Sequence, residues 1–320
     1  MIKNWDIKDY IENFSNKTNA TNFMKSTNIS KKNNIVKIDK FFDANRTAKT
    51  NGLSKHLFIT EGDSAQRFVT NGIKTIKGGL DIYGSYSTFG KFINPEKKGD
   101  DRLFENKIFK NLVDIIGLDV TIDEYTEDLI KNKLRFQSVI LTADADPDGI
   151  DICGLLLNMF NNKWPSLLKL GYVRRFITPI AVINNKSTKD KEMIFDENEY
   201  IYRFTNGEFS NNNINISYKK GLASLTNEET KEIFKDLDKY IKNMSYLYEE
   251  NNESYKESEN IFEIVFGKDP SLRKKWMSNT PDNKMFNPFK VNTIYMSNFF
   301  NYELIKFANY SIIRAIPSLY

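Results

Sequence analysis

The chain has 320 residues, enough for about two domains, and contains only one cysteine and one histidine. This composition excludes an intrachain disulfide framework, a zinc site built from several cysteines and any site that needs two histidines. The first hundred residues carry 17 basic against 10 acidic side chains, whereas the next hundred carry 13 against 17. Such asymmetry is typical either of an anion-binding surface beside a cation-binding site or of unevenly charged solvated faces.

No apolar run approaches the length of a membrane span, and the first residues, MIKNWDIKDYIENF, lack the apolar core of a signal peptide. We therefore expect an intracellular protein without a membrane segment. If it is an enzyme, carboxylates and bound cations must do most of its chemistry.

Apolar runs and helical periodicity predict the elements along the chain. In order, we expect a short helix and an extended arm in 1–50, a buried strand at 56–60, a helix from about Ser64, a helix at 104–118, a strand at 136–141, a helix at 150–161, a strand at 173–183 interrupted by Pro179, a helix at 226–243, a mobile stretch at 247–260, and helices at 269–278 and 301–314. Strand, turn and helix in this repeated order indicate an α/β fold with a parallel sheet.

Acidic residues follow two of the predicted strands. Glu61 ends the first, and Asp144, Asp146 and Asp148 follow a later one. Ligands of open parallel sheets bind beyond the carboxyl ends of the strands, so these side chains converge if the strands are neighbours. Clustered carboxylates repel one another unless a cation neutralises them, and oxygen ligands without histidine or cysteine favour Mg²⁺. The pattern predicts a magnesium site suited to phosphoryl transfer.

Two other interpretations of the aspartate cluster remain open. Its spacing matches the start of a calcium-binding EF-hand loop, but the twelfth position is Leu155 instead of glutamate and the preceding segment is a predicted strand. The cluster could also be a polar turn that caps a helix, although the Glu61 motif after an earlier strand makes this simple explanation less favourable.

The motifs Glu61-Gly62-Asp63-Ser64-Ala65 and Asp144-x-Asp146-x-Asp148-Gly149 together resemble the Toprim domain of type IIA DNA topoisomerases, although either alone also occurs in primases and other Toprim proteins. The acidic loop and the segment LRKKWMS look closest to bacteriophage versions. Further segments resemble this family in the same order along the chain: IDKFFDAN (38–45), YGSYSTFGKFIN (83–94), NMFNNKWPSLLKLGYVRRFITPI (158–180), ISYKKGLASLTNEETKEIF (216–234), FGKDPSLRKKWMSN (266–279) and NYELIKFANYSIIRAIPSLY (301–320).

The resemblance implies a Toprim fold, a parallel sheet flanked by helices, with a mixed α+β extension that leads into a winged-helix region. The implied boundaries are an N-terminal arm at 1–50, the Toprim domain at 51–185, its extension at 186–280, and a linker with the first helix of the DNA-gate region at 281–320.

The resemblance also implies roles for individual residues. Glu61, Asp144 and Asp146 would be catalytic and would bind two Mg²⁺ ions together with Asp148, and Mn²⁺ could substitute. The implied DNA-binding residues are Lys91, Asn94 and Lys220. We expect the nucleophilic tyrosine and the ATP site on other parts of a larger, two-copy assembly that acts on double-stranded DNA.

The chain departs from the family pattern in three places. Phe89 replaces the usual arginine, Ile150 and Asp151 replace a serine-histidine pair, and Ala223 replaces the second glycine of the tyrosine-lysine-glycine-leucine-glycine element. These departures leave two alternatives open, a non-catalytic subunit that binds DNA and docks a partner, and a stand-alone Toprim nuclease. We expect His56 and Cys153 to be structural.

Overall fold

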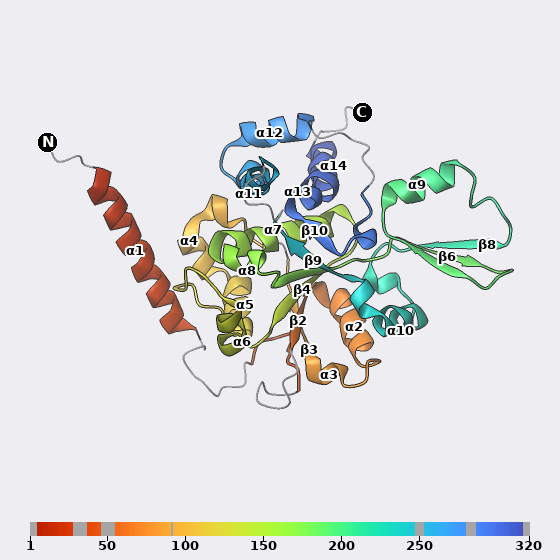
Figure 1. Ribbon diagram of the computed structural model, residues 1–320, viewed down its shortest axis with the longest axis horizontal. Helices are drawn as coiled ribbons and strands as arrows, with labels where there is room; N and C mark the ends of the chain where they lie inside the picture. Colours follow the sequence, from red (N-terminus) through yellow and green to blue (C-terminus); the bar gives the residue numbers. More distant parts are fainter. Residues whose placement is uncertain are drawn as a thin grey trace.

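A computed structural model describes residues 5–27, 37–45, 55–90, 92–246, 253–279 and 286–315. Its centre is a seven-stranded sheet with helices on both faces (Figure 1). The strand order is β1 (Phe41–Phe42), β3 (Tyr83–Thr88), β2 (His56–Glu61), β4 (Ser138–Thr142), β5 (Val173–Phe176), β9 (Ile241–Ser245) and β10 (Thr293–Tyr295). The four central strands β3, β2, β4 and β5 are parallel, which confirms the predicted α/β class.

Strands β2 and β4 have continuous apolar centres, as expected for parallel strands that helices cover on both sides. Leu57–Ile59 in β2 and Val139–Leu141 in β4 are almost completely buried. The helices are α1 (Trp5–Ser26), α2 (Gly62–Ile73), α3 (Gly79–Ile82), α4 (Pro95–Glu105), α5 (Lys107–Ile116), α6 (Glu127–Lys133), α7 (Pro147–Lys163), α8 (Pro165–Lys169) and α10 (Asn227–Lys235). Helices α2 and α7 begin directly beyond the carboxyl ends of β2 and β4, so the sheet places both helix N-termini at one edge.

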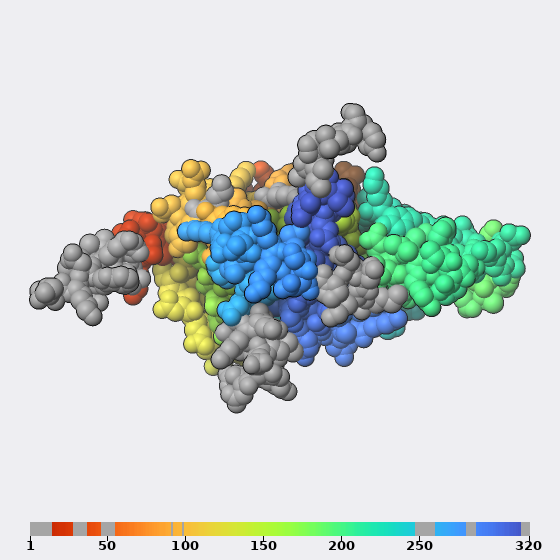
Figure 2. Space-filling model, turned by 90° about the horizontal axis from the view of Figure 1, so that it is seen from above, coloured from red at the N-terminus to blue at the C-terminus, as the bar shows by residue number. Residues whose placement is uncertain are grey.

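A second, three-stranded antiparallel sheet projects to one side of the molecule. It consists of β7 (Lys191–Ile194), β6 (Ala181–Asn185) and β8 (Ile214–Tyr218), and α9 (Glu197–Thr205) lies against it. Figure 2 shows this green lobe extending away from the main body. It is connected to the main sheet through β5, which precedes β6, and through α10, which follows β8.

The C-terminal segment packs mainly on α7, one of the helices that cover the main sheet. It contains α11 (Glu253–Phe266), α12 (Pro270–Asn279), α13 (Met296–Asn298), a π-helical stretch at Phe299–Leu304 and α14 (Ile305–Ala315). Within the π-helical stretch, Glu303 forms a buried ion pair with Arg175 of β5, with both carboxylate oxygens 2.8 Å from Arg175 Nη1. This contact fixes the C-terminal helices against the sheet.

Several predicted elements were wrong in extent. The helix predicted at 104–118 is two helices, because the Asn106 side chain accepts the Phe109 N–H and starts α5 anew. The strand predicted at 173–183 is β5 and β6, which belong to different sheets on either side of Pro179. The N-terminal helix, predicted to be short, has 22 residues.

The largest error concerns the helix predicted at 226–243. Helix α10 ends at Lys235, and the chain continues through a short 3₁₀ turn into β9, where the buried residues Lys242 and Met244 alternate with more exposed ones. This two-residue period is that of a strand. Of the stretch predicted to be mobile at 247–260, residues 247–252 lie outside the described part of the chain, and helix α11 begins at Glu253; the mobility itself stays a prediction.

The two residues expected to be structural, Cys153 and His56, both lie within elements of the main fold. Cys153 is buried in α7. The His56 imidazole lies in β2 with Nδ1 2.8 Å from Ser138 Oγ of β4. Among the described residues, no helix combines the length and the apolar character that a membrane crossing requires.

Candidate metal site at the carboxyl ends of β2 and β4

The predicted acidic residues lie at the carboxyl ends of two adjacent parallel strands. Glu61 is the last residue of β2, and Asp144 follows the end of β4 by two residues. The two strands are paired in register, with Thr60 opposite Thr142. Glu61 is also the residue before α2, but its side chain does not cap that helix. The sheet therefore places the Glu61 and Asp144 backbones at one edge, as the strand order predicts.

Asp144 is the most constrained of these acids. Its Oδ1 accepts a 2.7 Å hydrogen bond from the Leu222 N–H, which belongs to the loop between β8 and α10. The backbone of Gly221 approaches so closely that a Cβ there would lie 2.3 Å from Asp144 Oδ2. Burial raises the pKa of Asp144, the Leu222 N–H opposes this shift, and the negative charge of Asp146 adds to it. A cation bound here would relieve both unfavourable effects.

Asp146 and Asp148 lie at the start of α7. Asp146 Oδ1 accepts a 2.8 Å hydrogen bond from the Gly149 N–H and so caps the helix, while its Oδ2 remains for another ligand. Asp148 occupies the first turn, and its Oδ2 lies 3.5 Å from Arg314 Nη1 of α14. The capping role anticipated as an alternative for this cluster is thus real for Asp146, but it uses only one carboxylate oxygen.

A cavity of about 100 Å³ opens beside these acids. Asp144 and Asp146 line it together with three lysines, Lys219, Lys220 and Lys306, while Glu61 does not. The buried Arg175–Glu303 pair also contributes to its wall. Acidic and basic side chains from the sheet, the small antiparallel sheet and α14 therefore converge on one concave surface.

The donor set fits a hard divalent cation. In the described part of the chain, no three His, Cys, Asp or Glu side chains are arranged closely enough to form a complete metal cage. Mg²⁺ is usually bound by one or two carboxylates plus waters and substrate phosphates, so Asp144 and Asp146 on one cavity wall meet its needs. An EF-hand is wrong for this segment, because strand β4 rather than a helix precedes the aspartates.

The three residues expected to contact DNA have different settings. Lys220 is exposed at the cavity, whereas Lys91 lies outside the described residues. The Asn94 side chain is used within the protein: its Nδ2 donates to the Phe266 carbonyl, and its Oδ1 caps α4 through the Glu96 N–H. Asn94 also accepts a hydrogen bond from Asn158 Nδ2.

The three departures from the family pattern also have distinct settings. Ile150 and Asp151 are buried in the first turns of α7, and Ala223 is exposed. Phe89 is exposed, but the Lys40 ammonium lies 3.4 Å from its ring centroid and pairs with Asp63. A positive charge is thus present beside Phe89. Lys40 was not among the residues predicted for the site, although it lies in the segment 38–45 that resembles the family.

Comparisons with known proteins agree with this architecture. Residues 56–180 match the model of the Toprim domain, and residues 176–312 match that of the C-terminal associated domain of Toprim. DNA topoisomerase 2 of Drosophila melanogaster is 32% identical over 315 residues, which are 95% of this chain and 21% of that protein. The mitochondrial DNA topoisomerase 2 of Dictyostelium discoideum is 31% identical, over 97% of this chain and 22% of that protein.

A solved structure shows the same fold. The DNA-binding, cleavage and re-ligation domain of Plasmodium falciparum topoisomerase II superimposes with a TM-score of 0.76 at 30% identity, covering 88% of this chain and 36% of that one. The chain thus spans about a fifth of the length of the curated relatives named above. These relatives are eukaryotic, and the closer resemblance to bacteriophage versions stays a prediction. From its two Toprim-associated domains, its fold and its relatives, the chain belongs to the type II DNA topoisomerases, as a part that contains the Toprim domain.

Proposed function

We propose that this chain is the metal-binding part of an ATP-dependent type IIA topoisomerase that cleaves and religates double-stranded DNA. The observation that supports this most directly is the juxtaposition of Asp144 and Asp146 on one cavity wall, beside the end of the strand that carries Glu61. The names of the relatives, DNA topoisomerase 2, favour the same reaction.

Asp144 and Asp146 would coordinate Mg²⁺ through their free oxygens, with Glu61 and Asp148 as further ligands of a two-ion site. The bound ions would stabilise the charge that develops on the phosphate and on the leaving oxygen. The chain's own contribution is to fix Asp144 by the Leu222 N–H and to fix Asp146 by its capping bond to α7. Both carboxylates are thereby oriented before any ligand binds.

The DNA backbone would approach the site from its basic side. The exposed Lys220 at the cavity can neutralise a phosphate oxygen, and we assign the same role to Lys91. Asn94 would act by positioning α4, or by exchanging one of its internal hydrogen bonds for a phosphate contact. Mn²⁺ would replace Mg²⁺ at the carboxylates, since both accept oxygen ligands.

Other parts of the assembly would supply what this chain lacks. We assign the nucleophilic tyrosine and the ATP site to those parts, and we expect two copies of the chain in the complex, acting on DNA inside the cell. We also propose the domain boundaries at 50, 185 and 280. The boundary at 185 falls at the end of β6, so it separates this strand from its partners β7 and β8. The final region, 281–320, contributes β10 to the main sheet.

A cleavage assay tests this proposal. The chain is combined with a tyrosine-bearing topoisomerase part, plasmid DNA and Mg²⁺, and denaturant is added to trap DNA joined covalently to protein. We expect trapped DNA with the unaltered chain and at least a hundredfold less with Asp146→Asn, on the order of the loss that follows removal of one key electrostatic group. Nicking by the chain alone would favour a nuclease instead. Equal trapping with Asp146→Asn would favour a non-catalytic docking subunit.

A further inference from the structure

The loop between β8 and α10 contacts Asp144, a residue far from it in the sequence. The Leu222 N–H donates to Asp144 Oδ1 at 2.7 Å, and the Gly221 backbone contacts the carboxylate directly. Within the described residues, the Leu222 N–H is the only backbone amide that bonds to this carboxylate. The loop must therefore be held in place if its hydrogen bond is to orient the Asp144 carboxylate.

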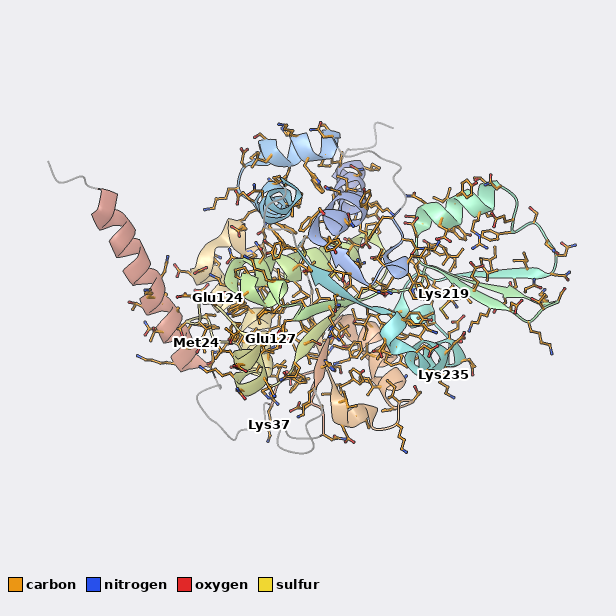
Figure 3. All side chains as sticks on the ribbon, in the orientation of Figure 1. Met24, Lys37, Glu124, Glu127, Lys219 and Lys235 are labelled. Atoms are coloured by element: carbon orange, nitrogen blue, oxygen red, sulfur yellow. The ribbon has the colours of Figure 1, made fainter. Side chains whose placement is uncertain are left out.

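A buried lysine anchors this loop. Lys219 Nζ donates to Glu229 Oε2 at 2.8 Å and to the Ser224 carbonyl at 3.3 Å, so it connects the two ends of the loop. The side chains of Lys219 and Glu229 are only 3% and 7% exposed. Figure 3 shows Lys219 where the small sheet leads into α10. The Lys219 N–H also donates to the Ile180 carbonyl at the start of β6.

Glu229 completes the anchor from the α10 side. Its Oε2 accepts the Thr226 N–H at 2.7 Å, while Thr226 Oγ1 accepts the Glu229 N–H, which forms a capping box at the start of α10. Burial alone would raise the pKa of Glu229, but its hydrogen bonds to Lys219 and Thr226 hold that pKa below its usual value. Glu229 is therefore charged, and the ion pair is formed at neutral pH.

Stability alone explains this pair poorly. Removing two charges from water costs several kcal/mol per ion, and replacing a buried ion pair by apolar residues of similar size is often neutral or stabilising. What the pair provides is geometry, because a single ammonium group bonds at once to the helix start and to the loop carbonyl at Ser224. Ser224 Oγ in turn donates to the Gly221 carbonyl at 2.6 Å.

We propose that Lys219 and Glu229 are positioning residues for the metal site. They hold the Gly221–Leu222 backbone against the Asp144 carboxylate, and so set the affinity of the site for a divalent cation. The proposal rests on the assignment of Asp144 as a metal ligand. In this role Lys219 and Glu229 act on the site through the loop and not as metal ligands.

The decisive variant replaces both partners by apolar residues, Lys219→Met with Glu229→Leu. It leaves no unpaired buried charge, so the chain is expected to fold, whereas either single change risks unfolding. The matched control is Glu232→Gln. Glu232 lies on the same helix α10, and its ion pair with Lys191 of β7 is more exposed.

Two measurements are made on each folded protein. The first is the amide proton shift of Leu222 in metal-free, ¹⁵N-leucine-labelled chain, which reports the hydrogen bond to Asp144 without any metal. The second is Mn²⁺ affinity by titration. We expect an upfield Leu222 shift and about 10- to 100-fold weaker Mn²⁺ binding in the double variant, the range for lost supporting contacts to a metal ligand, and neither change in Glu232→Gln.

An unchanged Leu222 shift, or an unchanged Mn²⁺ affinity despite a shifted amide, would overturn the proposal. If the unaltered chain binds no Mn²⁺ while the Leu222 amide still moves in the double variant, the metal assignment fails but the positioning contact stands. The same samples therefore test separately whether Asp144 binds a metal ion and whether Lys219 and Glu229 position the loop.

Discussion

Gly221→Ala tests how closely the loop is fitted to Asp144. The Gly221 backbone is extended, with φ of −177°, so alanine brings no backbone strain. Its Cβ, however, would lie 2.3 Å from Asp144 Oδ2. Non-bonded heavy atoms prefer about 3.5 Å or more, so the carboxylate or the loop must retreat by roughly 1 Å. A retreat of that size breaks the 2.7 Å hydrogen bond from Leu222.

The expected cost has two parts. Overpacking should lower the free energy of unfolding by about 1–3 kcal/mol, and displacing a ligating carboxylate should weaken Mn²⁺ binding by about 10- to 100-fold. Urea denaturation measures the first part, and Mn²⁺ titration of the folded protein measures the second. Gly72→Ala is the control, because its Cβ would lie 2.2 Å from the Phe234 ring, away from the acids. Gly72→Ala should lower the free energy of unfolding and leave the Mn²⁺ affinity unchanged. If both variants bind Mn²⁺ as tightly as the unaltered chain, the fit of the Gly221 loop to Asp144 does not determine the affinity.

Three further predictions concern stability. Because burial and Asp146 raise the pKa of Asp144, the charged carboxylate destabilises the metal-free fold, so Asp144→Asn should raise the urea midpoint in EDTA at pH 7; a lower midpoint would contradict this. Burial lowers the pKa of His56 from 6.5 to about 4. The neutral imidazole therefore contributes fully to the free energy of unfolding above pH 6.5, and this contribution, up to about 3 kcal/mol, is lost as the pH falls from 6.5 to 4. In denaturation curves measured across this range, His56→Gln should remove that loss. Arg175→Met should cost about 3–5 kcal/mol by leaving Glu303 buried and unpaired, and adding Glu303→Leu should recover most of it in thermal unfolding; no recovery would argue against the pair.

The sequence predicted the parallel core because its signals there are local. The apolar runs of β2 and β4 end abruptly in acidic turns, and glycines and capping residues separate strand from helix. For the same reason it located Glu61, Asp144 and Asp146 at one sheet edge, where the strand pairing places them.

Long-range pairing determined what the sequence could not predict. Residues 241–245 follow a charged helix and look like its continuation, but pairing with β5 and β10 makes them a strand. The segment 216–234 was identified by its resemblance to the family, but nothing in it predicts the hydrogen bond from Leu222 to Asp144, because these two residues are 78 positions apart in the chain. Asn94 has the same difficulty, because its partner Phe266 is distant in sequence.

Whether Asp144 ligates a divalent cation is measured by titrating the metal-free chain with Mn²⁺, followed by electron paramagnetic resonance. The unaltered chain should bind Mn²⁺ saturably, and Mg²⁺ should displace it. Asp144→Asn, which preserves the shape of the side chain, should abolish this binding, while Asp63→Asn, a change at the exposed acid paired with Lys40, should leave it intact. If the unaltered chain does not bind Mn²⁺, or if all three proteins bind it equally, Asp144 does not form a divalent cation site.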